Sequence, residues 1–110
     1  MITVVETATY LARASKLLTE EERMAVVSEV AARPDSGAII PDTGGLRKLR
    51  FGLDGRGKRG GARVIYLFLD LDMPVLLLLA YAKNERDDMT PAQKAGLAKM
   101  VTELKRRRRQ

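Results

Sequence analysis

The chain has 110 residues, a net charge of +6, and neither cysteine nor histidine. The missing cysteines exclude disulfides and thiolate metal sites, and the missing histidines exclude the Ser-His triad and the commonest general base. A reducing compartment suits such a chain, the amino terminus lacks a signal-peptide pattern, and the apolar run 74–82 is too short to span a bilayer. We therefore expect a soluble cytoplasmic protein with no membrane association.

The first 43 residues predict a short strand followed by two helices. Residues 2–6 form a β-branched run suited to an edge strand, and Thr7 or Thr9 then caps a helix that extends to about residue 18. Thr19 and Glu22 have the spacing of a capping box, which starts a second helix. The apolar stripe expected on this second helix is Met24, Val27, Val30 and Ala31. Two helices joined this tightly predict a helical hairpin.

Three segments with strand periodicity follow, at 46–51, 62–70 and 75–83. In the first, Leu46, Lys48 and Arg50 face one way, and Arg47, Leu49 and Phe51 face the other. The second segment is apolar on both faces, which is typical of a central strand, and so is the third. Short connections between the three segments predict an antiparallel meander.

The last helix begins at Thr90, where Pro91 and Gln93 complete a capping box. Its expected buried stripe is Leu97, Met100, Val101 and Leu104. The order of elements predicts an α+β fold in which an antiparallel sheet of three to four strands packs against the helical hairpin and the carboxy-terminal helix. No linker divides the chain, so residues 1–110 are expected to form one domain with a basic tail at 105–110.

Positive charge is concentrated in two places. Residues 44–63 carry seven cationic side chains against the single carboxylate of Asp54, and residues 105–110 carry five cationic side chains. The remainder of the chain is mildly acidic. A domain with one basic strand-and-loop region and one basic tail is suited to a polyanion, most commonly nucleic acid.

Several of these cations, with one tyrosine, are expected to converge at one end of the sheet. Lys48 and Arg50 share a face of one strand, Arg63 opens the next strand, and Tyr81 and Lys83 share a face near the end of the third strand. Arginine and lysine can hold a scissile phosphate and stabilise the extra negative charge of its transition state. Without histidine, any acid–base chemistry must come from lysine, arginine, tyrosine, aspartate or glutamate, and a lysine or tyrosine beside other cations could take the 2′-hydroxyl proton of RNA. The candidate catalytic residues are Lys48, Arg50, Arg63, Lys83 and Tyr81.

A wider set of residues is suited to contacting RNA. Each member also has a structural interpretation: strand-face cations commonly form a solvated surface, and a glycine-rich loop is commonly a soluble turn. Tyr66 can stack on a base, but its apolar neighbours favour core packing. Acidic residues such as Asp88 fall at turns, so neither a metal nor a cofactor is expected. The candidate RNA contacts are Arg47, Arg56, Lys58, Arg59, Tyr66, Asn84, Arg86, Arg106 and Arg107.

An ordered set of segments is similar to the RelE-type toxins of bacterial toxin–antitoxin pairs, particularly the HigB branch. These segments are GLRKLR at 45–50, GKRGGARVIY at 57–66, LAYAKNE at 79–85 and the helix that opens at Thr90. The resemblance implies a small α/β fold that enters the ribosomal A site and cuts mRNA. It also implies a cognate antitoxin, usually a helix-turn-helix protein, through which the complex meets operator DNA.

The resemblance assigns the basic strand pair of the family to Lys48 and Arg50, the arginine of the next strand to Arg63, and the lysine that closes the last strand to Lys83. Where several relatives have a second arginine, this chain has Asn84, with Arg86 two residues further on. A tyrosine that some relatives carry in the final helix is also missing. Either Tyr81 replaces that tyrosine or the cations alone carry the chemistry.

The resulting expectation is a ribosome-dependent mRNA endoribonuclease that leaves a 2′,3′-cyclic phosphate without using a metal. Two alternatives stay open. ParE-type toxins share the fold and act on DNA gyrase, although they generally lack clustered cations on the sheet. A non-enzymatic module that binds nucleic acid or a partner is the third possibility, because fold alone does not fix function.

Overall fold

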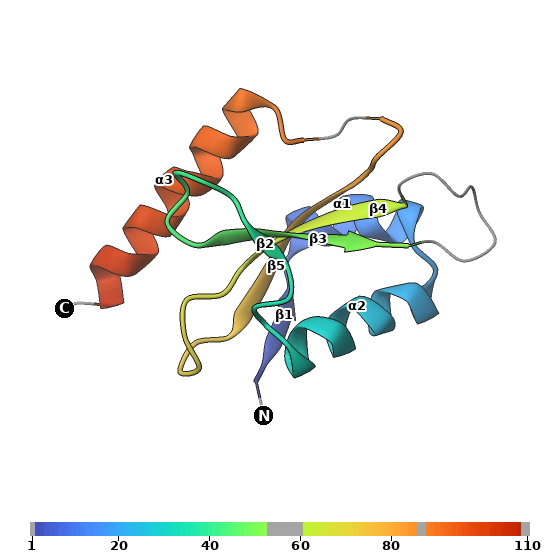
Figure 1. Ribbon diagram of the computed structural model, residues 1–110, viewed down its shortest axis with the longest axis horizontal. Coiled ribbons are helices and arrows are strands. Elements are labelled where there is room, and N and C mark those ends of the chain that lie inside the picture. Colours follow the sequence, from blue (N-terminus) through green and yellow to red (C-terminus); the bar gives the residue numbers. More distant parts are fainter. Residues whose placement is uncertain (1, 53–60, 86–87, 109–110) are drawn as a thin grey trace.

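The computed structural model describes residues 2–52, 61–85 and 88–108. These residues form a small α+β fold, as predicted, with five strands and three helices in the order β1, α1, α2, β2, β3, β4, β5 and α3 (Figure 1). The strands are β1 (Val4–Glu6), β2 (Ala38–Ile39), β3 (Leu46–Phe51), β4 (Ala62–Leu67) and β5 (Val75–Ala82). The helices are α1 (Ala8–Leu17), α2 (Glu20–Ala32) and α3 (Pro91–Arg108). None of these helices, within the described residues, combines the length and hydrophobicity needed to cross a membrane.

The sheet is larger than predicted and is mixed rather than purely antiparallel. Its strand order is β1-β5-β4-β3-β2, so the predicted meander of β3, β4 and β5 forms its centre. The expected edge strand β1 pairs parallel to β5, and the two-residue strand β2, which the sequence did not reveal, pairs antiparallel to β3. Two residues are too few to show a periodicity, and the partner of β1 lies about seventy residues away along the chain.

Helices cover both faces of the sheet, with α1 and α2 on one side and α3 on the other (Figure 1). On the side of the helical hairpin, Tyr10, Val26 and Val30 pack against Leu49 and Val64. On the opposite side, the fully buried members of the cluster include Leu46 and Ile65, which pack with Val101 of α3. All six residues of β4 are buried, which confirms that β4 is a central strand.

The predicted helix starts are confirmed. Thr7 caps α1, and the capping box at α2 is reciprocal: the Glu22 N–H donates to the Thr19 hydroxyl at 3.1 Å, and the Thr19 N–H donates to the Glu22 carboxylate at 2.8 Å. Thr90 and Gln93 make the same pair of bonds at α3. The assignment of Met24 to the buried stripe is wrong, because this side chain is 63 % exposed. Val26 is buried instead. Residues two positions apart lie about 200° apart around a helix axis, so Met24 and Val26 are on nearly opposite sides of α2.

Tyr66 fixes the connection between α2 and β2. Its buried hydroxyl accepts a hydrogen bond from the Gly37 N–H at 2.9 Å and donates one to the Pro34 carbonyl at 2.7 Å. A side chain at Gly37 would come within 2.8 Å of the Tyr66 ring, so glycine is required there. Arg47 adds hydrogen bonds to the carbonyls of Asp35 and Gly37. The chain therefore enters β2 at a defined position.

Two fully buried tyrosines on this side of the sheet form a matched pair for measuring the effect of these bonds. The Tyr10 hydroxyl is buried without a hydrogen-bond partner among the described residues, and burial raises its pKa to about 12. We expect Tyr66→Phe to lower the free energy of unfolding by about 1–3 kcal/mol, because the peptide groups that the Tyr66 hydroxyl bonds lose their partner. Tyr10→Phe should leave it unchanged or raise it by up to about 1 kcal/mol.

Urea unfolding of both variants, with midpoints compared at equal slope, tests this expectation. An equal loss of unfolding free energy in the two variants would show that the Tyr66 hydroxyl does not stabilise the connection through its hydrogen bonds.

Candidate functional site

Three of the predicted catalytic residues lie side by side across the centre of the sheet. Arg50 of β3 is the register partner of Arg63 of β4, which in turn is the register partner of Tyr81 of β5. Side chains of directly paired residues leave the same face of a sheet within about 5 Å of one another at Cβ. We call Arg50, Arg63 and Tyr81 the cross-strand row.

The cross-strand row lies on the face of the sheet that α3 covers. Ile65 and Leu67, which alternate with Arg63 along β4, pack in the same cluster as Val101 of α3, and Tyr81 is itself a member of that cluster. Lys48 lies two residues before Arg50 and so shares its face. Four of the five predicted catalytic residues therefore occupy one face of the sheet.

The three members of the cross-strand row differ in how exposed they are. Arg63 is only 4 % exposed and Tyr81 only 2 % exposed, whereas Arg50 is exposed. An Nη1–H group of Arg63 donates to the carbonyl of Ala62 at 3.2 Å. A cation with little surrounding water acts on a neighbouring anion through a lower effective dielectric than a surface cation does. Arg63 is therefore the member of the row with the strongest potential effect on a bound phosphate.

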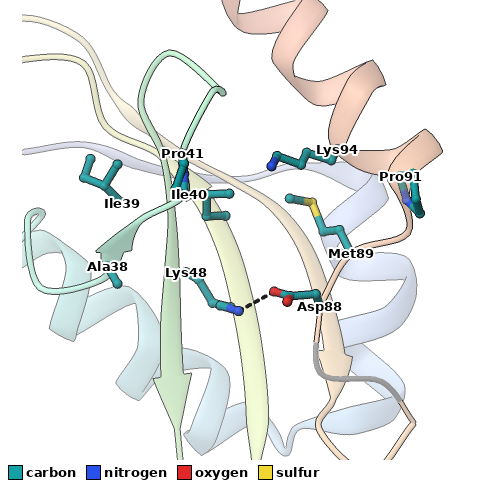
Figure 2. A pocket seen from close by; sticks show the side chains of 9 residues that line it. All are labelled: Ala38, Ile39, Ile40, Pro41, Lys48, Asp88, Met89, Pro91 and Lys94. Atoms are coloured by element: carbon teal, nitrogen blue, oxygen red, sulfur yellow. Dashed lines mark hydrogen bonds and ion pairs between the residues drawn. The ribbon is translucent and has the colours of Figure 1, made fainter.

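Lys48 contacts an acidic residue that follows β5. Its ammonium lies 2.5 Å from a carboxylate oxygen of Asp88, as Figure 2 shows. The Lys48 side chain is 18 % exposed and that of Asp88 is 76 % exposed. Both residues line a groove of about 570 Å³ between the segment that includes β2 and the start of α3, together with Ile40, Pro41, Met89 and Lys94. We call this the β2–α3 groove.

Lys83 and Asn84 lie in the exposed turn that follows β5. The Lys83 N–H donates to the Gly61 carbonyl at 3.0 Å, which continues the pairing of the two chain segments beyond the end of β4. Glu85 steadies this turn by accepting from the Ala82 N–H at 3.2 Å and from Arg13 of α1 at 2.9 Å. The backbone of Lys83 is therefore held at the same end of the sheet as Arg63.

Two residues predicted to contact RNA lie on the opposite face. The Tyr66 ring is fully buried in the cluster beneath the helical hairpin, so it has no free face on which a base could stack. This placement corrects the assignment of Tyr66 to the RNA-binding set and supports its alternative interpretation as a core residue. Arg47 donates to backbone carbonyls on the same side. Arg56, Lys58, Arg59 and Arg86 lie outside the described residues.

The basic tail is separated from the cross-strand row. Arg106 and Arg107 are exposed on the last turn of α3, where both pair with Glu103. Arg108 pairs with Asp70, which comes after the end of β4, whereas Arg63 lies near its beginning. The hydrogen bond from Arg108 holds the pKa of the Asp70 carboxyl below its usual value. The tail and the row are therefore two basic regions at opposite ends of the sheet.

The sequence did not identify Asp88, Met89 and Lys94 as site residues. Asp88 has the sequence context of a turn residue, and its contact with Lys48 joins positions forty residues apart. Such a contact has no local sequence signal, because it arises only when the start of α3 packs beside β3.

One comparison with known proteins bears on the whole chain. A family model described as the RelE toxin of the RelE/RelB toxin–antitoxin system matches residues 5–110. The match begins within β1, covers every later element, and includes the cross-strand row and the β2–α3 groove. With this match over nearly its entire length, the chain belongs to the RelE toxin family of toxin–antitoxin systems.

Proposed function

We propose that this toxin is a ribosome-dependent mRNA endoribonuclease that inhibits translation. The observation that carries the proposal is the cross-strand row, in which two arginines and a tyrosine from three adjacent strands share one face with Lys48. Family membership supports the role of a toxin with a cognate antitoxin. Clustered cations on the sheet favour RNA cleavage over action on gyrase, and over a module that only binds.

The proposed reaction is an internal transesterification. The 2′-oxygen of one nucleotide bonds to the adjacent phosphorus, and the bond from phosphorus to the 5′-oxygen of the next nucleotide breaks. The 2′-hydroxyl loses a proton and the departing 5′-oxygen gains one, so the products are a 2′,3′-cyclic phosphate and a 5′-hydroxyl. The chain supplies lysine and tyrosine for these proton transfers, since it has no histidine.

Arg63 and Arg50 have the chemistry to stabilise the pentavalent phosphate. Guanidinium groups bind phosphate oxygens through paired hydrogen bonds, and groups fixed in place before the reaction lower its barrier most effectively. Arg50 and Lys83 are exposed and Arg63 is nearly buried. An incoming phosphate would therefore meet Arg50 and Lys83 first and engage Arg63 as it settles into the site.

The basic tail provides a second, separate contact for RNA. Arg106 and Arg107 are exposed at the far end of α3, and exposed cations there suit attraction to a polyanion such as ribosomal RNA. In this proposal the cross-strand row acts on the message in the cytoplasm, while the tail adds affinity for the ribosome. The cognate antitoxin, which we propose to be a helix-turn-helix protein, would connect the complex to operator DNA.

The decisive experiment is brief expression of the chain without its antitoxin, followed by mapping of mRNA 5′ ends. A parallel culture receives an inhibitor that keeps ribosomes off the message. We expect new 5′ ends within translated frames, and we expect them to disappear with the inhibitor. Growth arrest with intact mRNA would contradict the proposal and direct attention to gyrase.

Arg63→Gln should lower the rate of mRNA cleavage by about 100-fold or more, which is the usual effect of removing one preorganised donor to a transition state. Arg33→Gln is the matched control, because the Arg33 side chain, at the end of α2, is exposed and pairs with Glu29 on that helix. Cleavage of ribosome-bound mRNA measures the effect, and the thermal unfolding of each variant confirms its fold. A folded Arg63→Gln variant that cuts at the normal rate would remove Arg63 from the site.

The double variant Arg106→Gln/Arg107→Gln should bind ribosomes less tightly and with weaker salt dependence. Each lost phosphate contact lowers the slope of log Kobs against log salt concentration by roughly one. Cleavage at saturating toxin should stay unchanged, because the tail is remote from the cross-strand row. The matching control is Lys16→Gln/Arg33→Gln on the helical hairpin, where both side chains are exposed. An unchanged slope in the tail variant would show that these arginines do not contact phosphate.

A further inference from the structure

The β2–α3 groove has the composition of a nucleotide site. Cationic side chains stand on both of its sides, Lys48 on β3 and Lys94 on α3, and apolar surface between them comes from Ile40, Pro41 and Met89. Figure 2 shows Lys94 extending from α3 toward Ile40 and Pro41, with the Met89 side chain beside it. Cations suit a phosphate, and an apolar surface suits the face of a base.

Lys48 connects this groove to the cross-strand row. It lies two residues before Arg50 on the same face of β3, and its ammonium points across the floor of the groove toward Asp88 (Figure 2). Lys48 therefore lines the groove and lies beside Arg50, the exposed member of the cross-strand row. A strand of RNA whose phosphate lies at the row would place a neighbouring nucleotide at the groove.

Asp88 occupies the position that a phosphate would take on Lys48. Its carboxylate is an anion 2.5 Å from the ammonium, and the Asp88 side chain is 76 % exposed. Because the Asp88 side chain is largely exposed, an entering anion can approach the pair from solvent and take the place of this carboxylate on the ammonium. The carboxylate also repels other anions that approach the groove.

We propose that the β2–α3 groove is a subsite for the nucleotide next to the scissile phosphate, and that RNA enters it by displacing Asp88 from Lys48. The proposal rests on the proposed function, because it takes the cross-strand row as the place of cleavage. RNA is favoured over an acidic protein segment as the occupant, since Lys48, which lines the groove, shares its strand face with Arg50, and Arg50 pairs in register with Arg63.

Binding of a six-nucleotide single-stranded RNA, methylated at every 2′-oxygen to prevent cleavage, tests the groove directly. We expect Asp88→Asn to raise the affinity about threefold to fivefold, as removal of an opposing exposed charge should. Lys94→Gln should lower the affinity and reduce the salt slope by about 0.7. The controls are Asp72→Asn, an exposed turn residue outside the groove, and Lys99→Gln, an exposed lysine of the same helix.

A second measurement reports on the groove itself. In protein labelled at its methionine methyl groups, addition of the same RNA should shift the Met89 resonance and leave that of Met24 on α2 unchanged. Asp88→Asn should also lower the toxin concentration needed for half-maximal cleavage on ribosomes.

The outcomes separate this proposal from the proposed function. If the wild-type chain cuts mRNA but both groove variants bind RNA like their controls, the groove proposal fails alone. If RNA binding responds as expected but no message is cut, the nuclease proposal fails and the groove remains an RNA site. Weaker RNA binding by Asp88→Asn, or a Lys94→Gln effect on antitoxin capture without one on RNA, would overturn the groove proposal.

Discussion

The register of β3, β4 and β5 is the constraint on which the rest of the structure depends. Arg63 is the one charged residue of β4, a strand whose every residue is buried. A slip of one residue would turn Arg63 into the cluster beneath the helical hairpin and turn Val64 or Ala62 toward α3. Burying an unpaired charge in an apolar cluster is far more costly than losing a few contacts. The same pairing that closes the core therefore aligns Arg50, Arg63 and Tyr81.

Local patterns in the sequence predicted the helices and most strands, but they could not predict contacts between segments that are distant along the chain. Alternation assigned Lys48 and Arg50 to one face and Leu49 to the other, and the capping boxes at Thr19 and Thr90 located two helix starts to the residue. Met24 was misassigned because α2 has apolar residues on more than one side, so that spacing alone does not select the buried stripe. The parallel pairing of β1, the hydrogen bonds of the Tyr66 hydroxyl and the burial of Arg63 all depend on segments that come together only in the folded chain.

The two basic regions serve different physical purposes in this architecture. The cross-strand row is partly buried and held by the centre of the sheet, which gives it the fixed geometry that phosphate chemistry needs. Arg106 and Arg107 of the tail lie on the last turn of α3, are exposed and pair with Glu103, so they are suited to attraction at longer range. Separating the two allows affinity for a large polyanion to change without disturbing the residues that would contact the reacting phosphate.

Tyr66 has a consequence for the opposite side of the sheet. Its hydroxyl holds Gly37 from the face of the helical hairpin, and Gly37 leads directly into β2 and on to Ile40 and Pro41, which form one wall of the β2–α3 groove. The two faces are thus mechanically coupled through a single short segment of backbone. We therefore expect substitutions in the core beneath the helical hairpin to change the width of the groove while every groove residue stays the same. Related chains could differ in what the groove binds through such distant substitutions.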